Sequence, residues 1–302
     1  MKKLFVLSSL VAVAAMVVSA CGGGGSQASD LLGAIKERGY ILVSTDPNYA
    51  PQSFLNTESS RPADTKCPGD ALSTAEMAGF DVDVAIAIGD ALGVETCFAT
   101  PGWDTITAGS WVDKWDVSVG SMTVTPDRRE ILDFSVPYYY TPAAVAVRAD
   151  ADFGSIADLA GETLCAGTST TYETWLNGGD LGAEIPVLAP APAVTVITLD
   201  TDQDCPQSIK DGREDFIGYV TSATVIYANL IEDFPVKFVG TPVFYEPLAA
   251  AFDKSSTLPT GTLVAEVDKL FTQMHSDGSL TALSENWFKD QDGNGIDYTK
   301  AQ

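Results

Sequence analysis

The sequence predicts an α/β protein with largely parallel sheets, arranged in two similar lobes. Segments typical of strands alternate with segments whose apolar residues recur at helical spacing, which is the pattern of sheets covered by helices. The alternation starts again near Ala143, although no stretch of sequence is repeated. Roughly 280 residues follow the N-terminal apolar run, and this length suffices for two modest domains.

The elements expected before Ala143 follow from apolar spacing and from helix stop signals. They are a helix, a strand and a loop in residues 29–51, a polar surface insertion from Glu58 to Met77, a helix over 80–93 that stops at Gly93, a strand over 94–100, and a short helix followed by a strand in 102–124.

The elements expected after Ala143 repeat the same alternation. They are a strand at 143–150, a helix, strand, turn and helix in 156–179, a strand at 194–200, a helix at 202–215, a strand at 216–222, a helix at 223–230, strands at 236–240 and 247–252, and a helical tail over 262–288.

The N-terminus resembles an export signal. A basic start and an apolar run of signal-peptide length end in small residues directly before Cys21. This arrangement resembles the bacterial lipoprotein processing site, at which the cysteine is lipidated. A plain signal peptide or a transmembrane anchor is the alternative, although the run is short for a span. We expect residues 1–20 to be a signal peptide and residues 21–30 a lipidated, flexible tether.

The chain is strongly acidic. Its formal net charge is -24, and removal of Lys2 and Lys3 with the signal peptide takes it to -26. Such a charge disfavours nucleic acid and anionic lipid surfaces as partners. The acidity favours solubility and identifies no ligand.

Six stretches of sequence occur in a specific order. They are STDPNYAPQSF, GFDVDVAIAIGDALG, GWDTITAGSWVDKWDVSVGSMTVTPDRREILDFSVPYY, LAGETLCAGTSTTYETWL, DGREDF and MHSDGSLTALSENWF. Together they resemble the extracellular solute-binding proteins of family 3, the receptors of polar amino acid ABC importers. The resemblance covers about Leu31 to Phe288.

This resemblance implies the periplasmic binding protein type II fold, in which two crossover strands form a hinge and a ligand cleft lies between the lobes. Lobe 1 would span residues 31–141 and return over residues 247–302, and lobe 2 would fill residues 142–246. The hinge strands are expected near YYTPAAV and FYEPLAA.

Four cysteines remain after processing, and export favours disulfides. They are Cys67, Cys97, Cys165 and Cys205. Four cysteines allow three pairings. We favour Cys67–Cys97 and Cys165–Cys205, because each pair then lies within one predicted lobe. The sequence has no Cys-x-x-Cys and one histidine, so no zinc site is expected. We assign no metal and no cofactor.

Arg128, in SMTVTPDR, matches the carboxylate-binding arginine of the family. A guanidinium group can hold a carboxylate through two parallel charge-assisted hydrogen bonds. Ser121 and Thr123 match donors on the same wall of the pocket. The alternative is that Arg128 lies on the surface and pairs with Asp127 or Glu130. Arg129 is expected on the surface.

Asp46 and Tyr49, in TDPNYAP, match the first ligand loop of the family. There the aspartate receives a donor from the ligand's side chain, and the tyrosine forms one wall. Trp103 matches an aromatic residue on the opposite wall, so the two rings could sandwich an aliphatic or cationic ligand. From the residues alone, an ordinary turn and simple core packing explain these positions equally well.

The predicted second lobe contributes the turn AGTSTTYETW, in which a strand ends and a helix begins. The family places a Gly-Thr-Thr-like turn here, against the ligand's carboxylate. Free amide groups at a helix start suit an anion, but serine and threonine also begin many helices that bind nothing. Ser169, Thr170 and Thr171 are the candidates, and the sequence does not decide among them.

One feature of the family is missing. Members that bind α-amino acids carry an aspartate that receives the ammonium group, and its position falls near Val220 or Thr221. Because a buried ammonium group without an anionic partner is costly, another carboxylate must replace it, or the ligand has no conventional amino group. The candidates for replacement are Asp46, Glu173 and Glu246.

These observations predict a membrane-tethered, monomeric receptor that binds an amino acid or a similar small carboxylate outside the cytoplasm. It would deliver this ligand to the permease and ATPase of an ABC importer. One alternative is an exported enzyme similar to cyclohexadienyl dehydratase, which would need a general acid or base in the cleft. The single histidine, His275, lies in the C-terminal helix instead. Another alternative is a ligand-sensing domain for a membrane signalling partner.

Overall fold

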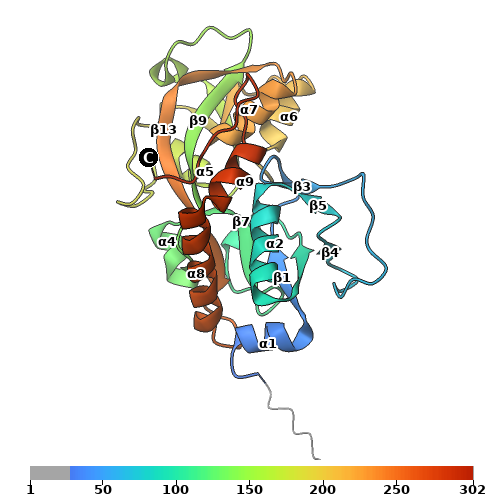
Figure 1. Ribbon diagram of the computed structural model, residues 1–302. Coiled ribbons are helices and arrows are strands. Elements are labelled where there is room, and N and C mark those ends of the chain that lie inside the picture. The colour runs from blue at the N-terminus through green and yellow to red at the C-terminus, as the bar shows by residue number, and fades with distance from the viewer. Residues whose placement is uncertain (1–27, 302) are drawn as a thin grey trace, which may run out of the picture.

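Two long strands, β9 (Tyr139–Arg148) and β13 (Val236–Asp253), run antiparallel to each other and connect the two lobes of the molecule (Figure 1). The computed structural model describes residues 28–301, so the predicted signal peptide and the predicted lipidation site at Cys21 lie outside the described residues. Within them, no helix combines the length and the apolar character that a bilayer span requires.

Within residues 28–301, ten strands form one mixed sheet, in the order β11-β10-β12-β9-β13-β7-β1-β6-β4, with β8 also paired to β13. The remaining strands form the small sheet β2-β3-β5. The strands not yet located are β1 (Tyr40–Ser44), β2 (Asn48–Tyr49), β3 (Ser53–Leu55), β4 (Leu72–Ser73), β5 (Met77–Ala78), β6 (Glu95–Ala99), β7 (Val117–Thr123), β8 (Leu132–Phe134), β10 (Thr163–Gly167), β11 (Thr195–Leu199) and β12 (Gly218–Ser222).

The sheet has one parallel part in each lobe. In lobe 1, which contains β1, β6 and β7, β1 is parallel to its two neighbours. In lobe 2, which contains β10, β11 and β12, β10 is parallel to its two neighbours. Both crossover strands pair antiparallel with their neighbours, so each lobe keeps the predicted parallel core and the whole sheet is mixed. The predicted boundaries near residues 141 and 246 fall inside β9 and β13.

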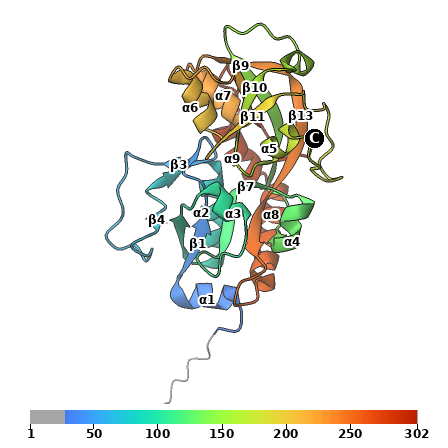
Figure 2. The same cartoon turned by 180° about the vertical axis from the view of Figure 1, so that it is seen from behind.

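Helices cover both faces of the lobe 1 sheet. Helices α2 (Phe80–Leu92) and α8 (Gly261–Asp277) lie in front of it in Figure 1, and α3 (Trp103–Thr107) lies on the opposite face in Figure 2. The core between α2, α8 and the sheet includes Val43, Phe80, Val119, Phe252 and Phe271. The helices of lobe 1 are α1 (Leu31–Arg38), α2 (Phe80–Leu92), α3 (Trp103–Thr107), α4 (Pro126–Ile131), α8 (Gly261–Asp277) and α9 (Ser279–Trp287).

Lobe 2 is built in the same way on a smaller scale. Its core includes Val145, Leu164, Trp175, Val220 and Phe244, all of them buried. Its helices are the 3-10 helix η1 (Ile156–Leu159), α5 (Thr171–Leu176), α6 (Asp204–Lys210) and α7 (Ala223–Ile231).

Two predicted elements differ from the structure. The strands expected at 236–240 and 247–252 are one strand, β13, whose pairing with β9 shifts register between Val239 and Phe244. The predicted C-terminal helix is divided in two at Gly278, whose φ of 80° is a left-handed conformation that glycine adopts without steric cost.

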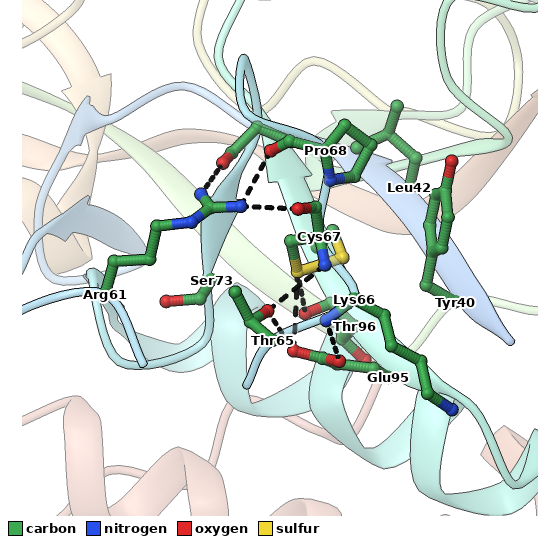
Figure 3. Close-up of a disulfide and its surroundings, with 12 residues drawn as sticks. Tyr40, Leu42, Arg61, Thr65, Lys66, Cys67, Pro68, Ser73, Glu95 and Thr96 are labelled. Carbon is green, nitrogen blue, oxygen red and sulfur yellow. Dashed lines mark hydrogen bonds between the residues drawn. A yellow bond between two sulfur atoms is a disulfide. The ribbon is translucent and has the colours of Figure 1, made fainter. Parts of the chain in front are cut away.

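The disulfides join Cys67 to Cys97 and Cys165 to Cys205, which is the pairing that we favoured. The first disulfide fastens the predicted surface insertion to β6 (Figure 3). Arg61 braces the same segment, because its guanidinium group donates hydrogen bonds to the carbonyl oxygens of Cys67, Pro68 and Ala71. The bonds of Arg61 therefore brace the insertion internally, whereas the disulfide and a hydrogen bond from the Lys66 amide to Glu95 Oε2 at 2.8 Å hold it against β6.

Candidate ligand-binding site between the lobes

A cavity lies between the two lobes, beside the crossover strand β13. Most of its residues follow the carboxyl ends of parallel strands or stand on them, and this edge is where ligands bind in open α/β sheets. Glu246 stands instead on β13, which is antiparallel to its neighbours. All the predicted ligand-binding residues except Ser169 line the cavity. The lining residues are Asp46, Tyr49, Trp103, Gly120, Ser121, Thr123, Arg128, Thr170, Thr171, Tyr172, Asp200, Thr201, Asp202 and Glu246.

Arg128 is buried in this cavity and is not a surface residue. Helix α4 begins after Thr125, whose hydroxyl accepts a hydrogen bond from the Arg128 amide at 3.3 Å. The guanidinium group donates from Nη1 to the Thr123 carbonyl and from Nη2 to the Ser169 carbonyl, each at 3.0 Å. The Trp103 ring lies 5.5 Å from its Cζ, within cation–π range. Arg128 thus contacts both lobes, with remaining N–H groups available to a ligand.

The adjacent Arg129 differs from Arg128. It is exposed and forms an ion pair with Glu184 at 3.0 Å, as expected of a surface arginine. The pair connects α4 to the segment that follows α5, so it also crosses from lobe 1 to lobe 2.

Glu246 on β13 accepts hydrogen bonds from side chains of β7 and of α5. Its Oε1 accepts hydrogen bonds from Thr123 Oγ1 at 2.7 Å and from Thr171 Oγ1, and its Oε2 accepts one from Tyr172 OH at 2.7 Å. Burial raises the pKa of Glu246, while the three hydroxyl donors and the charge of Arg128 oppose that rise. One carboxyl group therefore connects β7 of lobe 1 with α5 of lobe 2.

Asp46 stands just beyond the end of β1. Its Oδ1 accepts a hydrogen bond from the Asn48 amide at 2.8 Å, so it forms the turn that the sequence also allowed and lines the cavity as well. Only 8% of its surface is exposed. Desolvation raises its pKa to about 6, against the lowering effect of the Asn48 bond.

A buried network of hydrogen bonds holds Ser121 in place. Its φ is 57°, a left-handed conformation, and its hydroxyl donates to Asp81 Oδ2 at 2.6 Å. Tyr138 OH donates to Asp81 Oδ1 at 2.7 Å and accepts from the Ser121 amide at 3.1 Å. Asp81 on α2 thus fixes the backbone at this wall of the cavity, a role that sequence analysis did not assign to it.

The three candidate residues in the turn after β10, which are Ser169, Thr170 and Thr171, have different roles. Thr170 Oγ1 accepts from the Glu173 amide at 3.1 Å and donates to the Gly167 carbonyl at 2.7 Å, so it caps α5. Thr171 donates to Glu246, and both threonines line the cavity. Ser169 does not line it. Its carbonyl accepts from Arg128 and its amide donates to Glu173 Oε2 at 2.7 Å, so Glu173 braces the turn.

Asp202 is one of the lining residues that sequence analysis missed, together with Gly120, Tyr172, Asp200 and Thr201. It follows β11, and its Oδ1 accepts a hydrogen bond from the Gly167 amide at 3.0 Å. Burial, together with the charges of Glu246 and Asp46, raises its pKa to about 8. A sequence signal existed, because TLDTD places acidic residues directly after a predicted parallel strand, at the edge where ligands bind.

Residues 41–290 match the bacterial extracellular solute-binding proteins, family 3. The chain belongs to this family. The cavity described above brings together groups from both lobes.

Several proteins of known name resemble this family 3 chain along most of its length. The L-cystine-binding protein TcyJ of Escherichia coli (strain K12) is 27% identical over 272 residues, which cover 89% of this chain and 88% of that protein. A crystal structure of the ancestral amino acid-binding protein AncCDT-1, a precursor of cyclohexadienyl dehydratase, has a TM-score of 0.67, 28% identity and coverage of 85% and 99%. An ancestral arginine-binding protein bound to arginine has a TM-score of 0.65, 26% identity and coverage of 83% and 98%. The chain thus has the two-lobed type II fold.

Proposed function

We propose that this family 3 protein is the receptor of an ABC importer and binds an amino acid or a similar small carboxylate. The observation that carries the proposal is the burial of Arg128 in a cavity between two lobes, where carbonyl groups of both lobes orient its guanidinium group. Such a group suits the carboxylate that amino acids share. The names of similar proteins, which refer to L-cystine and arginine, point to the same class of ligand.

Binding would proceed by closure of the two lobes. The ligand first meets the groups of lobe 1, namely Asp46, Tyr49, Trp103 and Arg128, in the open cleft. Lobe 2 then closes and adds Thr170 and Thr171. The closed form gains only from contacts that bridge both lobes, so the ligand shifts the equilibrium through those contacts. A permease can distinguish the closed shape from the open one, and no bond is broken.

We further propose the predicted organisation of the chain. Residues 1–20 would direct export, lipid on Cys21 would hold the protein at the membrane, and residues 21–30 would space it from the surface. Lobe 1 would comprise residues 31–141 and 247–302, with lobe 2 between them. The protein would act as a monomer outside the cytoplasm.

We propose binding without turnover. His275, the single histidine of the chain, has its Nε2 2.9 Å from the carbonyl of Pro137 and is not among the lining residues of the cavity. Glu173, the acid considered at the turn of lobe 2, braces the backbone of Ser169. Recovery of every bound compound unchanged after incubation, as measured by mass spectrometry, supports a receptor, and a new product would contradict it.

A thermal-shift screen tests the proposed function. The panel is the twenty amino acids, L-cystine and small carboxylates that lack an amino group. A ligand present at a hundred times its Kd stabilises the fold by about 2.7 kcal/mol, which raises Tm measurably. At least one amino acid is expected to do so, with the Kd then measured by calorimetry. A panel without any stabilising compound would contradict the proposal.

A further inference from the structure

The segment that follows α9 packs on the crossover strand β9. The residues matched to family 3 end at residue 290, so most of this segment follows the family match. In Figure 1 it runs from α9 across β9 and β13. Two of its residues, Tyr298 and Thr299, are only 7% and 5% exposed. Polar segments beyond the last helix of a domain are usually exposed, so this burial calls for specific contacts.

Lobe 1 holds this segment through α9. The segment first makes a turn, in which Asp290 Oδ1 accepts a hydrogen bond from the Asn294 amide at 2.8 Å. The Ser284 hydroxyl on α9 then donates to the Ile296 carbonyl at 2.8 Å and accepts from the Tyr298 amide at 2.9 Å. One buried hydroxyl group thus fixes the backbone on both sides of residue 297.

The Tyr298 backbone bonds to β9 where the two lobes meet. The Tyr140 amide on β9 donates a hydrogen bond to the Tyr298 carbonyl at 2.7 Å. Tyr140 pairs with Pro247 of β13, and the pairing of β9 with β12 of lobe 2 starts at Ala143. The Tyr298 carbonyl therefore occupies the edge of β9 directly before the lobe 2 sheet begins, within the predicted hinge.

Aromatic rings behind the cavity connect Tyr298 to a wall of the ligand site. The Tyr298 ring lies edge-on to the Phe288 ring, with 5.6 Å between centroids. The Phe288 ring stacks on the Tyr139 ring at 5.7 Å. The hydroxyl of Tyr139 is hydrogen-bonded to that of Ser121, which lines the cavity. The segment thus packs behind the lobe 1 wall of the site.

The hydroxyl group of Tyr298 lies close to lobe 2. Burial raises the pKa of Tyr298, and the nearby hydroxyl groups of Tyr227 on α7 and Tyr245 on β13 add to that rise. Tyr227 is three positions after Thr224, so the two side chains share one face of α7. Thr224 accepts a hydrogen bond from Gln52 of lobe 1. This face of α7 is therefore turned toward lobe 1, with Tyr298 beside it.

We propose that residues 296–299 form a strap across the hinge, which stabilises the closed arrangement of the lobes. The proposal rests on lobe closure in the proposed function, but it involves no ligand contact, since Tyr298 is not a lining residue of the cavity. The strap is fixed to α9 and β9, whereas Tyr227 moves with lobe 2. Separation of the lobes removes Tyr298 from α7, so the strap favours the closed form. Ligand affinity is then set partly by a segment outside the cavity.

Three variants separate the strap from a general effect on lobe 1. Tyr298→Ala removes the ring that lies between the lobes. Leu263→Ala removes a buried side chain of α8 from the same lobe 1 core and should lower the free energy of unfolding without changing closure. Lys300→Ala removes an exposed ion pair with Asp297 in the same segment and should change neither stability nor closure measurably.

Two measurements report closure. Small-angle X-ray scattering without any amino acid gives the radius of gyration, which rises when the lobes separate. Calorimetry gives Kd for the amino acid that produces the largest thermal shift among the twenty of the screen. We expect Tyr298→Ala to enlarge the radius of gyration and to raise Kd roughly 2- to 12-fold, the range for loss of one aromatic contact. Leu263→Ala should do neither, even where it lowers stability as much.

The affinities decide the proposal. If Kd for Tyr298→Ala is no higher than Kd for Leu263→Ala, the strap is overturned and the receptor function stands. If Tyr298→Ala does not fold, Tyr298→Leu is compared in the same way, because it keeps an apolar side chain in the lobe 1 core and has no ring to pack near Tyr227.

Failure of the receptor function gives a different result. If no amino acid of the screen binds, that function fails, and the radius of gyration alone decides the strap. A larger value for Tyr298→Ala than for Leu263→Ala then supports the strap, and equal values overturn it.

Discussion

The side-chain amide of Gln52 donates a 2.6 Å hydrogen bond to the hydroxyl oxygen of Thr224. Gln52 precedes β3 of lobe 1, and Thr224 lies in the first turn of α7 of lobe 2. Both residues are buried. This bond therefore crosses between the lobes, and we expect it to stabilise the closed form over one in which the lobes have moved apart.

We expect Gln52→Ala to weaken ligand binding by shifting the unliganded protein toward the open form. A neutral hydrogen bond contributes a net 0.5 to 1.5 kcal/mol, so Kd should rise by roughly 2- to 12-fold. Calorimetry with the tightest amino acid from the screen measures this change. Gln207→Ala is the matched control, because Gln207 bonds to Asp211 within lobe 2. Equal affinities for Gln52→Ala and this control would show that the bond does not contribute to closure.

Arg128 and Arg129 are adjacent in sequence but differ in environment, and this makes them a matched pair. Arg128→Met should remove at least about 99% of the affinity, since a charge-assisted bidentate contact to the ligand is lost. Arg129→Met removes an exposed ion pair worth about 0 to 1 kcal/mol and should change Kd little. The thermal shift produced by the ligand reports both effects. A similar shift in the two variants would exclude Arg128 as the carboxylate-binding residue.

The order of the helices and strands was predictable because each element is indicated by residues within its own stretch of sequence. Apolar spacing and the stop at Gly93 are enough to locate α2, and the motif around Arg128 is enough to locate one wall of the cavity. The continuity of β13 was not predictable in this way. Gly240, with a φ of 67°, and Pro242 interrupt any local strand signal, and pairing with β9 carries the strand past them.

The electrostatics of the cavity were predictable only in part. Asp46 and Arg128 were expected to lie there because each belongs to a recognisable motif. Asp202 was not, because its role depends on the Gly167 amide, 35 positions away, and on a lobe that closes over Asp46. Ser169 was a candidate by sequence, but its φ of 62° belongs to a turn in which its backbone, and not its side chain, contacts Arg128.

The two disulfides should affect the protein differently. Each closes a loop, over sequence separations of 30 and 40, so loss of either should lower the free energy of unfolding by about 2 to 4 kcal/mol. Cys67→Ala with Cys97→Ala frees the insertion of lobe 1, which does not line the cavity, and ligand affinity should persist. Cys165→Ala with Cys205→Ala frees the start of α6.

Loss of the second disulfide should therefore lower affinity as well as stability. Cys205 lies three positions after Asp202, and its bond to β10 holds the loop that carries this carboxyl group. Urea denaturation measures the stability of both double variants, and calorimetry measures their affinity. Identical losses of affinity in the two double variants would refute this division of roles.

The carboxyl group of Asp81 is wholly buried, so its role can be tested through the dependence of the free energy of unfolding on pH. Burial raises its pKa to about 7, although the hydroxyl groups of Ser121 and Tyr138 oppose the rise. The native state therefore binds this proton more tightly than the unfolded chain, in which the pKa is about 3.9. The stabilisation is present in full below the unfolded value and is lost as the pH rises through about 7.

Asp81→Asn should accordingly flatten the dependence of stability on pH. The unmodified protein should lose free energy of unfolding between pH 5 and pH 8, and the variant should lose less, since asparagine does not titrate. The variant should be less stable at pH 5, where one hydrogen bond of the network is mismatched, and the difference should shrink or reverse at pH 8. Urea denaturation at the two pH values, without ligand, measures both slopes. Parallel slopes would mean that the carboxyl group of Asp81 is solvated in solution and does not fix Ser121 through a buried network.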